Sequence, residues 1–174
     1  MEIAHALHGW GDFYLLVGTA GATLVALLFV AVSLGAGFLT EDRANATRAF
    51  FSPVVVHFAA VFVISAVALI PEHSANFYAA LIGLCALVGI GVSTFTTIQL
   101  LRNRWTEYLQ DHLGYGLLPL IGYAALLGAA WMIHREIEGG FDVLAVALVV
   151  LLVINIRNAW DLTLSMVRRR TKPD

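Results

Sequence analysis

The chain has few of the residues that support catalysis, redox chemistry or disulfide bonding. Its 174 residues include a single cysteine, Cys85, which excludes an intrachain disulfide and any paired-cysteine metal or redox motif. Charged residues make up only 13% of the chain, and no GxSxG elbow, P-loop or pair of intramembrane carboxylates occurs in it. We therefore expect a protein that is not an enzyme, needs no cofactor and binds no nucleic acid.

Hydrophobic residues make up 60% of the chain and are gathered in long apolar runs. A helix of about 20 apolar residues crosses the ~30 Å hydrocarbon core of a bilayer. The runs predict an all-α bundle of five transmembrane helices that forms one membrane domain over residues 1–174. The predicted spans are residues 13–39, 49–70, 77–101, 116–133 and 141–160, followed by a basic tail over residues 161–174.

The distribution of positive charge predicts the orientation of this bundle. With five spans, segments 40–48, 102–115 and 157–174 share one side, and together they hold every Lys and Arg except Arg135. Short segments rich in Lys and Arg remain on the cytoplasmic side of a membrane. We therefore expect the N-terminus outside and the C-terminus in the cytoplasm.

Small residues recur at every fourth position in the first predicted span and at intervals of three and four residues in the fourth. The two sets are Gly18, Ala22 and Ala26, and Gly122, Ala125 and Ala129. Such stripes let helix backbones approach closely where lipid removes the hydrophobic drive for association. We expect them to pack against other helices, either in further copies of the chain or in a different membrane protein.

Polar side chains within the spans concentrate towards the basic side, and they are the candidates for a functional site. The set is His57, Ser93, Thr96, Thr97, Asn155, Arg157, Asn158 and Asp161. These side chains could line a pathway. Two structural alternatives remain open: the hydroxyls could bond carbonyls of their own helix, and Arg157 could pair with Asp161 or extend to the headgroups.

His57 is the most distinctive member of this set, because it is an ionisable side chain among Val and Phe residues. In an apolar helix we expect a neutral imidazole that donates one hydrogen bond and accepts another. One hypothesis is a structural hydrogen bond to Asn155 or Asn158. The others are a proton-sensing or pathway role, and ligation of a haem.

The side opposite the arginines is acidic and also carries histidines. Its candidates are Glu72, His73, His134, Glu136 and Glu138. They could be ordinary interfacial polarity, a mouth that concentrates cations, or ligands of a metal. No compact metal-binding motif is present, and we predict no metal site.

One stretch of the chain supports a resemblance. Residues 13–34 read FYLLVGTAGATLVALLFVAVSL. This stretch resembles the opening of small bacterial inner-membrane proteins of unassigned function, some of which are labelled as modulators of a membrane-bound AAA+ protease. The resemblance covers mainly the first span and implies a multi-pass protein of the bacterial cytoplasmic membrane.

Three functions remain open for such a protein. The concentration of polar groups on the basic side favours a small homo-oligomeric channel that prefers cations. Because five helices enclose little volume, its pathway would follow an axis shared by several copies, lined by His57 or by Asn158 and Asp161. The second function is a helper subunit of a larger membrane complex, such as a protease or an oxidase, and the third is a haem-binding subunit.

Overall fold

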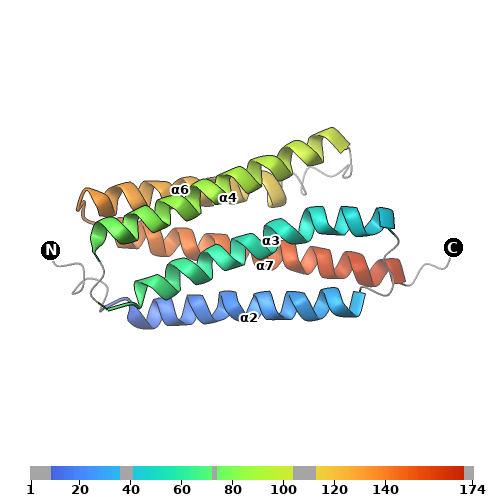
Figure 1. Ribbon diagram of the computed structural model, residues 1–174, viewed down its shortest axis with the longest axis horizontal. Helices are drawn as coiled ribbons and strands as arrows, with labels where there is room; N and C mark the ends of the chain where they lie inside the picture. The colour runs from blue at the N-terminus through green and yellow to red at the C-terminus, as the bar shows by residue number, and fades with distance from the viewer. Residues whose placement is uncertain (1–8, 36–40, 72–73, 104–112, 171–174) are drawn as a thin grey trace.

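The computed structural model describes residues 9–35, 41–71, 74–103 and 113–170. These residues form five α-helices and one π-helical turn, and they contain no strand (Figure 1). The predicted all-α bundle is confirmed. The elements are α2 (Gly11–Gly35), α3 (Glu41–Ala68), α4 (Ala75–Asn103), the π-turn η2 (Leu113–Leu117), α6 (Leu118–His134) and α7 (Gly140–Arg170).

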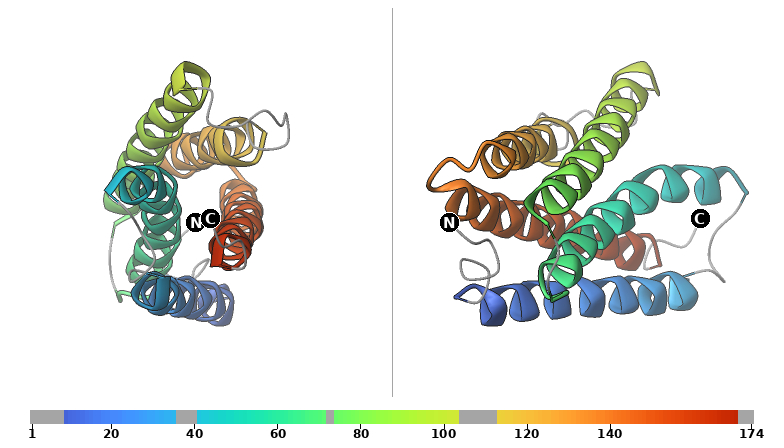
Figure 2. Two further views of the ribbon diagram at one scale, coloured as in Figure 1. Left: turned by 90° about the vertical axis from the view of Figure 1, so that its right-hand side faces the viewer. Right: turned by 60° about the vertical axis from the view of Figure 1, so that its left-hand side comes forward.

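Consecutive helices run antiparallel along the long axis, so α2 begins at the opposite end of the bundle from the end of α7 (Figure 1). Helix α2 packs on α3, α4 on α6, and α6 on α7. Helices α3 and α7 also contact each other and lie between α2 and the α4–α6 pair (Figure 2). Helix α2 is therefore the outermost helix, with neighbours mainly on one side.

Two helices extend beyond the predicted spans. Helix α3 begins at Glu41, within the segment predicted to connect the first two spans. Helix α7 continues to Arg170, so most of the predicted basic tail prolongs the last helix.

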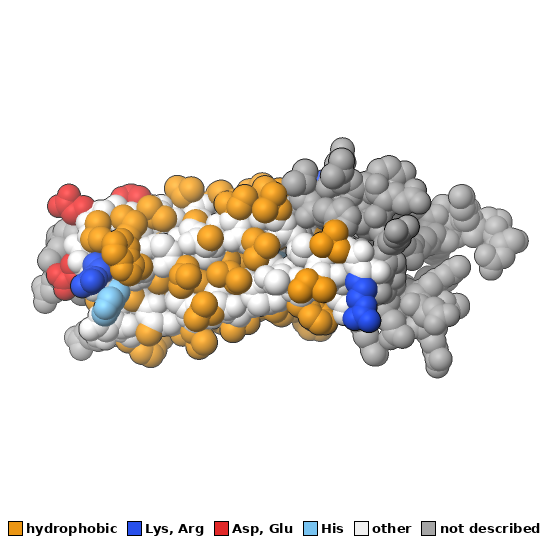
Figure 3. Space-filling view, turned by 90° about the horizontal axis from the view of Figure 1, so that it is seen from above, with side chains coloured by type: hydrophobic (Ala, Val, Ile, Leu, Met, Phe, Trp, Pro, Cys, Tyr) orange, Lys and Arg blue, Asp and Glu red, His pale blue; other side chains and the backbone are white. Residues whose placement is uncertain are grey.

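The outside of the bundle is apolar over most of its length. Helices α2, α4 and α7 are long and apolar enough to cross a membrane, as is α6 together with the π-turn over Gly114–His134. Helix α3 contributes a shorter apolar stretch at Pro53–Ala68. Leu16 and Leu34 of α2 are 70% and 75% exposed, and Trp131 of α6 is 57% exposed. On the face shown in Figure 3, hydrophobic side chains are spread along the described body of the molecule, and acidic side chains lie at one end. Water does not tolerate so large an apolar surface, so lipid covers it.

The buried apolar side chains form two separate clusters. The large core occupies the end of the bundle where Glu136 and Glu138 lie, which we name the acidic end. The small core lies towards the end where α4 and α7 terminate, which we name the basic end. Members of the large core include Tyr14, Val61, Ile64, Tyr78, Ala86, Tyr123, Leu126, Leu148 and Leu151. The small core consists of Leu28, Val54, Phe58, Tyr115 and Leu162.

Candidate functional site

Polar side chains interrupt the buried interior between the two cores. On α3, His57 lies one turn from Val61 of the large core and one turn from Val54 of the small core. On α7, Asn155 follows Leu151 and Asn158 precedes Leu162, again by one turn each. We name this region the polar layer. Its members, all buried, are His57, Ser93, Thr96, Tyr123, Asn155 and Asn158.

The polar layer is centred on a hydrogen bond between α3 and α6. Nδ1 of His57 lies 2.6 Å from the hydroxyl of Tyr123, and both side chains are at most 1% exposed. A tyrosine hydroxyl can donate to an unprotonated ring nitrogen or accept from a protonated one, so the direction follows the histidine tautomer. The expected partners, Asn155 and Asn158, do not fill this role, because their amide groups donate elsewhere.

Tyr123 can reach His57 because a neighbouring residue has no side chain. The Tyr123 ring lies directly against Gly89 of α4, where a Cβ atom would overlap three ring atoms. On the adjacent face of α6, Gly122 contacts Leu151 of α7 in the same close manner. These two contacts hold α6 tightly between α4 and α7. Neither Tyr123 nor Gly89 was a candidate from the sequence, because tyrosine and glycine are common in membrane helices.

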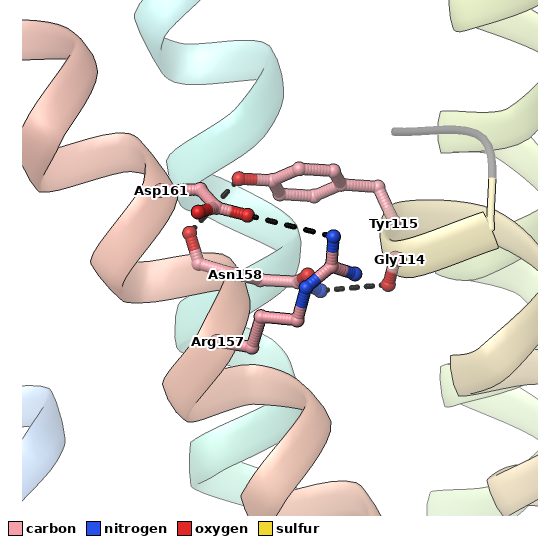
Figure 4. A network of polar contacts seen from close by, with 5 residues as sticks. All are labelled: Gly114, Tyr115, Arg157, Asn158 and Asp161. Carbon is pink, nitrogen blue, oxygen red and sulfur yellow. Dashed lines mark hydrogen bonds and ion pairs between the residues drawn. The ribbon is translucent and has the colours of Figure 1, made fainter. Parts of the chain in front are cut away.

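Asn158 joins α7 to the π-turn at the basic end (Figure 4). Its Nδ2 donates to the carbonyl of Gly114 over 2.8 Å, and the Tyr115 hydroxyl donates to the carbonyl of Asn158 over 2.9 Å. In a π-helix the carbonyl of residue i accepts from the amide of residue i+5, which for Gly114 is Pro119. Since proline has no amide hydrogen, Asn158 supplies the donor that Pro119 lacks.

Arg157 and Asp161 lie where the polar layer reaches the surface. The shortest distance between their charged groups is 3.9 Å, and their side chains are 44% and 41% exposed. An ion pair this exposed contributes little to stability. The guanidinium also lies over Gly114, where a Cβ atom would come within 2.6 Å of Nη1 (Figure 4). The pairing expected between Arg157 and Asp161 is therefore present, and its surroundings are the π-turn.

The hydroxyls of α4 divide into two groups. Thr96 donates to the carbonyl of Val92, and Thr97 donates to the carbonyl of Ser93, as the structural alternative predicts. Thr97 also lies against Gly116 of the π-turn. Ser93, by contrast, is fully buried, and its Oγ has no hydrogen-bond partner.

Two more oxygens of the polar layer share this property. Nδ2 of Asn155 donates to the carbonyl of Leu151 in its own helix, while its Oδ1 has no partner. Oδ1 of Asn158 is likewise buried without a partner. Ser93, Asn155 and Asn158 thus present three unpaired oxygens inside the bundle.

The expectation that His57 and Asn158 line an axis between copies does not fit their positions. Both side chains are 1% exposed in a single chain, because they face the interior of the bundle. Asp161 remains partly exposed, but it borders the π-turn of its own chain (Figure 4). A pathway that uses His57 and Asn158 must therefore run within each bundle.

At the acidic end the predicted candidates are dispersed. His134 shares a 3.0 Å hydrogen bond with Asn76, which joins the end of α6 to the start of α4. Glu136 and Glu138 are exposed in the turn before α7, and Glu72 and His73 lie outside the described residues. Within the part of the chain that the structure describes, no three His, Cys, Asp or Glu residues come together as a metal site.

The predicted small-residue faces are used differently in the two helices. On α2, Gly18 packs against Ser65, but Ala22 and Ala26 are exposed. The second close contact with α3 is instead Gly21, where a Cβ atom would lie 3.2 Å from the carbonyl oxygen of Phe58. On α6 the buried members are Gly122 and Ala129, while Ala125 is half-buried.

The fold and the apolar exterior define this chain as a multi-pass helical membrane protein with a polar layer in its interior. Comparison with known proteins adds no closer relationship: no family model, curated protein or solved structure matches the chain.

Proposed function

We propose that the protein is a membrane channel that favours cations, and that the cation it conducts is the proton. The observation that carries this proposal is the buried hydrogen bond between His57 and Tyr123 at the centre of the polar layer. An ionisable side chain inside a membrane bundle is costly and usually serves a pathway or a proton relay. The other histidine among the described residues is His134, which is exposed at the acidic end.

The packing of the large core favours protons over larger ions. Tyr78, Leu126 and Leu148 are fully buried there and leave no exposed surface on their side chains. A hydrated metal ion needs a continuous opening, whereas a proton passes along hydrogen-bonded groups. Ser65, which is buried in α3 two turns from His57 towards the acidic end, offers a further hydroxyl beyond the pair.

The chemistry of the pair suits proton relay. The imidazole takes a proton on one ring nitrogen and releases a proton from the other. When the protonated ring releases its Nδ1 proton to the Tyr123 oxygen, the hydroxyl passes its own proton to a further hydrogen-bonded acceptor, such as water. The ring is then neutral with its proton on Nε2, and rotation of the ring restores the starting arrangement. His57 and Tyr123 are therefore the residues we assign to conduction. Copies of the chain could associate without sharing this path.

Proton flux into sealed liposomes tests the proposal. Purified protein is reconstituted with an internal pH dye, and a potassium gradient with valinomycin drives protons inward. We expect acidification faster than in protein-free liposomes, and we expect His57→Gln and Tyr123→Phe each to abolish most of it. His134→Gln is the matched control and should conduct normally. Equal fluxes in wild type and His57→Gln would overturn the proposal.

A helper role in a larger membrane complex is the second candidate function. It is favoured by the exposed Ala22 and Ala26 on α2, the outermost helix, because small residues at this spacing suit close packing against another membrane helix. Its signature is co-purification with an unrelated membrane protein and no proton flux from the isolated chain.

A haem-binding role would show as an absorbance band in the purified protein. We also propose that the protein belongs to the bacterial cytoplasmic membrane, as the resemblance of its first span implies.

A further inference from the structure

We infer that the polar layer binds water that enters from the basic end and reaches as far as His57. The inference rests on the proposed function, since this water would deliver protons to His57 from one side of the membrane. Whether or not protons then cross, we expect this water to stop at the large core.

The unpaired oxygens of the polar layer need partners. Oγ of Ser93 and Oδ1 of Asn155 and Asn158 are buried without a hydrogen-bond partner. A buried polar atom without a partner costs free energy, and in most proteins such atoms are satisfied by internal water with two to four polar neighbours. Three such oxygens in one region favour several bound waters over a single isolated one.

These oxygens lie at neighbouring levels along the bundle on α4 and α7. Gly89 of α4 and Leu151 of α7 are level with each other, since they contact the adjacent residues Tyr123 and Gly122 of α6. Ser93 and Asn155 each follow these contact residues by one helical turn towards the basic end. Asn158 follows by nearly another turn. Along the bundle axis, the three oxygens therefore occupy successive levels between the His57–Tyr123 pair and the π-turn.

The two ends of this series differ in polarity. At the basic end, Asn158 adjoins Arg157 and Asp161, whose side chains are more than 40% exposed (Figure 4). On the other side of His57, the large core closes the bundle with Tyr78, Ile82 and other fully buried side chains. The small core also lies towards the basic end, so we expect water to enter beside it, along Asn158 and the Arg157–Asp161 pair. The large core presents mainly apolar side chains to this water, with the buried hydroxyls of Tyr14, Ser65 and Tyr78 among them.

Cysteine accessibility tests the inference. In a Cys85→Ser background, Ser93→Cys and Asn155→Cys are compared with Ala86→Cys and Ala147→Cys. These controls are buried on the same two helices, about two turns nearer the acidic end. A small cationic methanethiosulfonate is applied to each face of sealed vesicles, and modification is read by mass. Arg102→Cys, which is exposed at the end of α4, reports access to the basic side.

We expect the thiols of the Ser93→Cys and Asn155→Cys variants to be modified from the basic side only, and the two controls to be protected. Equal protection at all four positions, with Arg102→Cys labelled, would overturn the inference. Labelling without proton flux in the unsubstituted protein would support the inferred water while rejecting the proposed function. Proton flux without labelling of the Ser93→Cys and Asn155→Cys variants would support the proposed function and reject the inferred water.

A measurement on the unsubstituted protein covers the case in which a variant fails to fold. Hydroxyl radicals generated from water by X-rays oxidise aromatic side chains beside bound water. We expect oxidation of Tyr123 and Tyr115 and protection of Tyr78, although Tyr78 and Tyr123 are equally buried. Equal protection of all three tyrosines would overturn the inference.

Discussion

At the scale of single residues, the site depends on a glycine that carries no chemistry. Gly89 leaves the space that the Tyr123 ring occupies, and Tyr123 in that position reaches Nδ1 of His57. Replacing Gly89, Tyr123 or His57 therefore alters the contacts that the other two residues make. The chemistry of the pair is therefore set by packing between α4 and α6 as well as by the two polar side chains.

We expect Gly89→Ala to lower the free energy of unfolding by about 1–3 kcal/mol, the usual cost of overpacking a close contact. The added methyl group must displace the Tyr123 ring and so also lengthen its bond to His57. Gly91→Ala is the matched control, since a Cβ atom at Gly91 meets nothing within 4 Å. It should leave stability unchanged or raise it by up to about 1 kcal/mol through helix propensity. Unfolding in mixed micelles measures both, and equal stabilities would contradict the packing argument.

At the scale of elements, the π-turn η2 and the start of α6 depend on a side chain from another helix. Pro119 removes the amide that the carbonyl of Gly114 would otherwise accept from, and Asn158 of α7 replaces it. This exchange ties the beginning of α6 to α7 at the basic end. It also explains why a helical irregularity with a proline is tolerated at this depth.

We expect Asn158→Leu to destabilise the wild type by about 1–2 kcal/mol, because it leaves a buried carbonyl without a donor. In a Pro119→Ala background the restored amide can serve Gly114, so the same substitution should cost less. A double-mutant cycle should give a coupling of about 0.5–1 kcal/mol. Asn158→Leu also removes the unpaired Oδ1 of Asn158, but it does so in both backgrounds, so the energetic effect of that loss cancels in the cycle. Additive effects would reject the replacement of the missing amide by Asn158.

At the scale of the whole molecule, charge and helix count determine how the bundle sits in the membrane. Five antiparallel helices place the start of α2 and the end of α7 at opposite ends (Figure 1). Arg102 and Arg157 are towards the second of these ends, whereas Arg135 is at the first. The positive-inside rule then predicts that the basic end is cytoplasmic.

We expect a phosphatase fused to the N-terminus to be active outside the cell, and a fluorescent protein fused to the C-terminus to be fluorescent inside it. Converting Arg168, Arg169 and Arg170 to Gln should weaken this orientation and give a mixed population, because these residues contribute to the charge bias. Both reporters on the same side would reject a five-span topology. The same fusions would show which compartment the basic end faces.

The sequence predicted which segments are helices better than it predicted which side of each helix faces its neighbours, for a reason specific to membrane proteins. A helix that faces lipid is apolar all round, so length and composition mark its existence but give little amphipathic signal for its rotation. Ala22 and Ala26 of α2 illustrate this, because they share a regular spacing with Gly18 but face outward. Gly21 makes the close contact instead. Some helix ends in the structure also differ from the predicted ends. Helix α3 begins at Glu41, whereas the predicted span begins at residue 49, because a helix can continue beyond its apolar segment.

The candidate site was predicted as a set of residue types and not as an arrangement. His57, Ser93, Asn155 and Asn158 stand out in the sequence because polar groups are rare in such helices. Their inward direction, and the choice of Tyr123 over Asn155 or Asn158 as the partner of His57, could not be read from spacing. Both depend on contacts between residues that are far apart in the chain.

The sequence by itself determined that this is a helical membrane protein, because the bilayer accepts only apolar segments long enough to cross it, and it determined which segments carry the charge. The tertiary structure decided which side chains meet. Gly89 and Gly122 let α6 approach α4 and α7, and that approach brings Tyr123 to His57. Hydropathy is a property of one segment, whereas a hydrogen bond or a close contact requires two, so only the packed bundle distinguishes a polar layer from scattered polar residues.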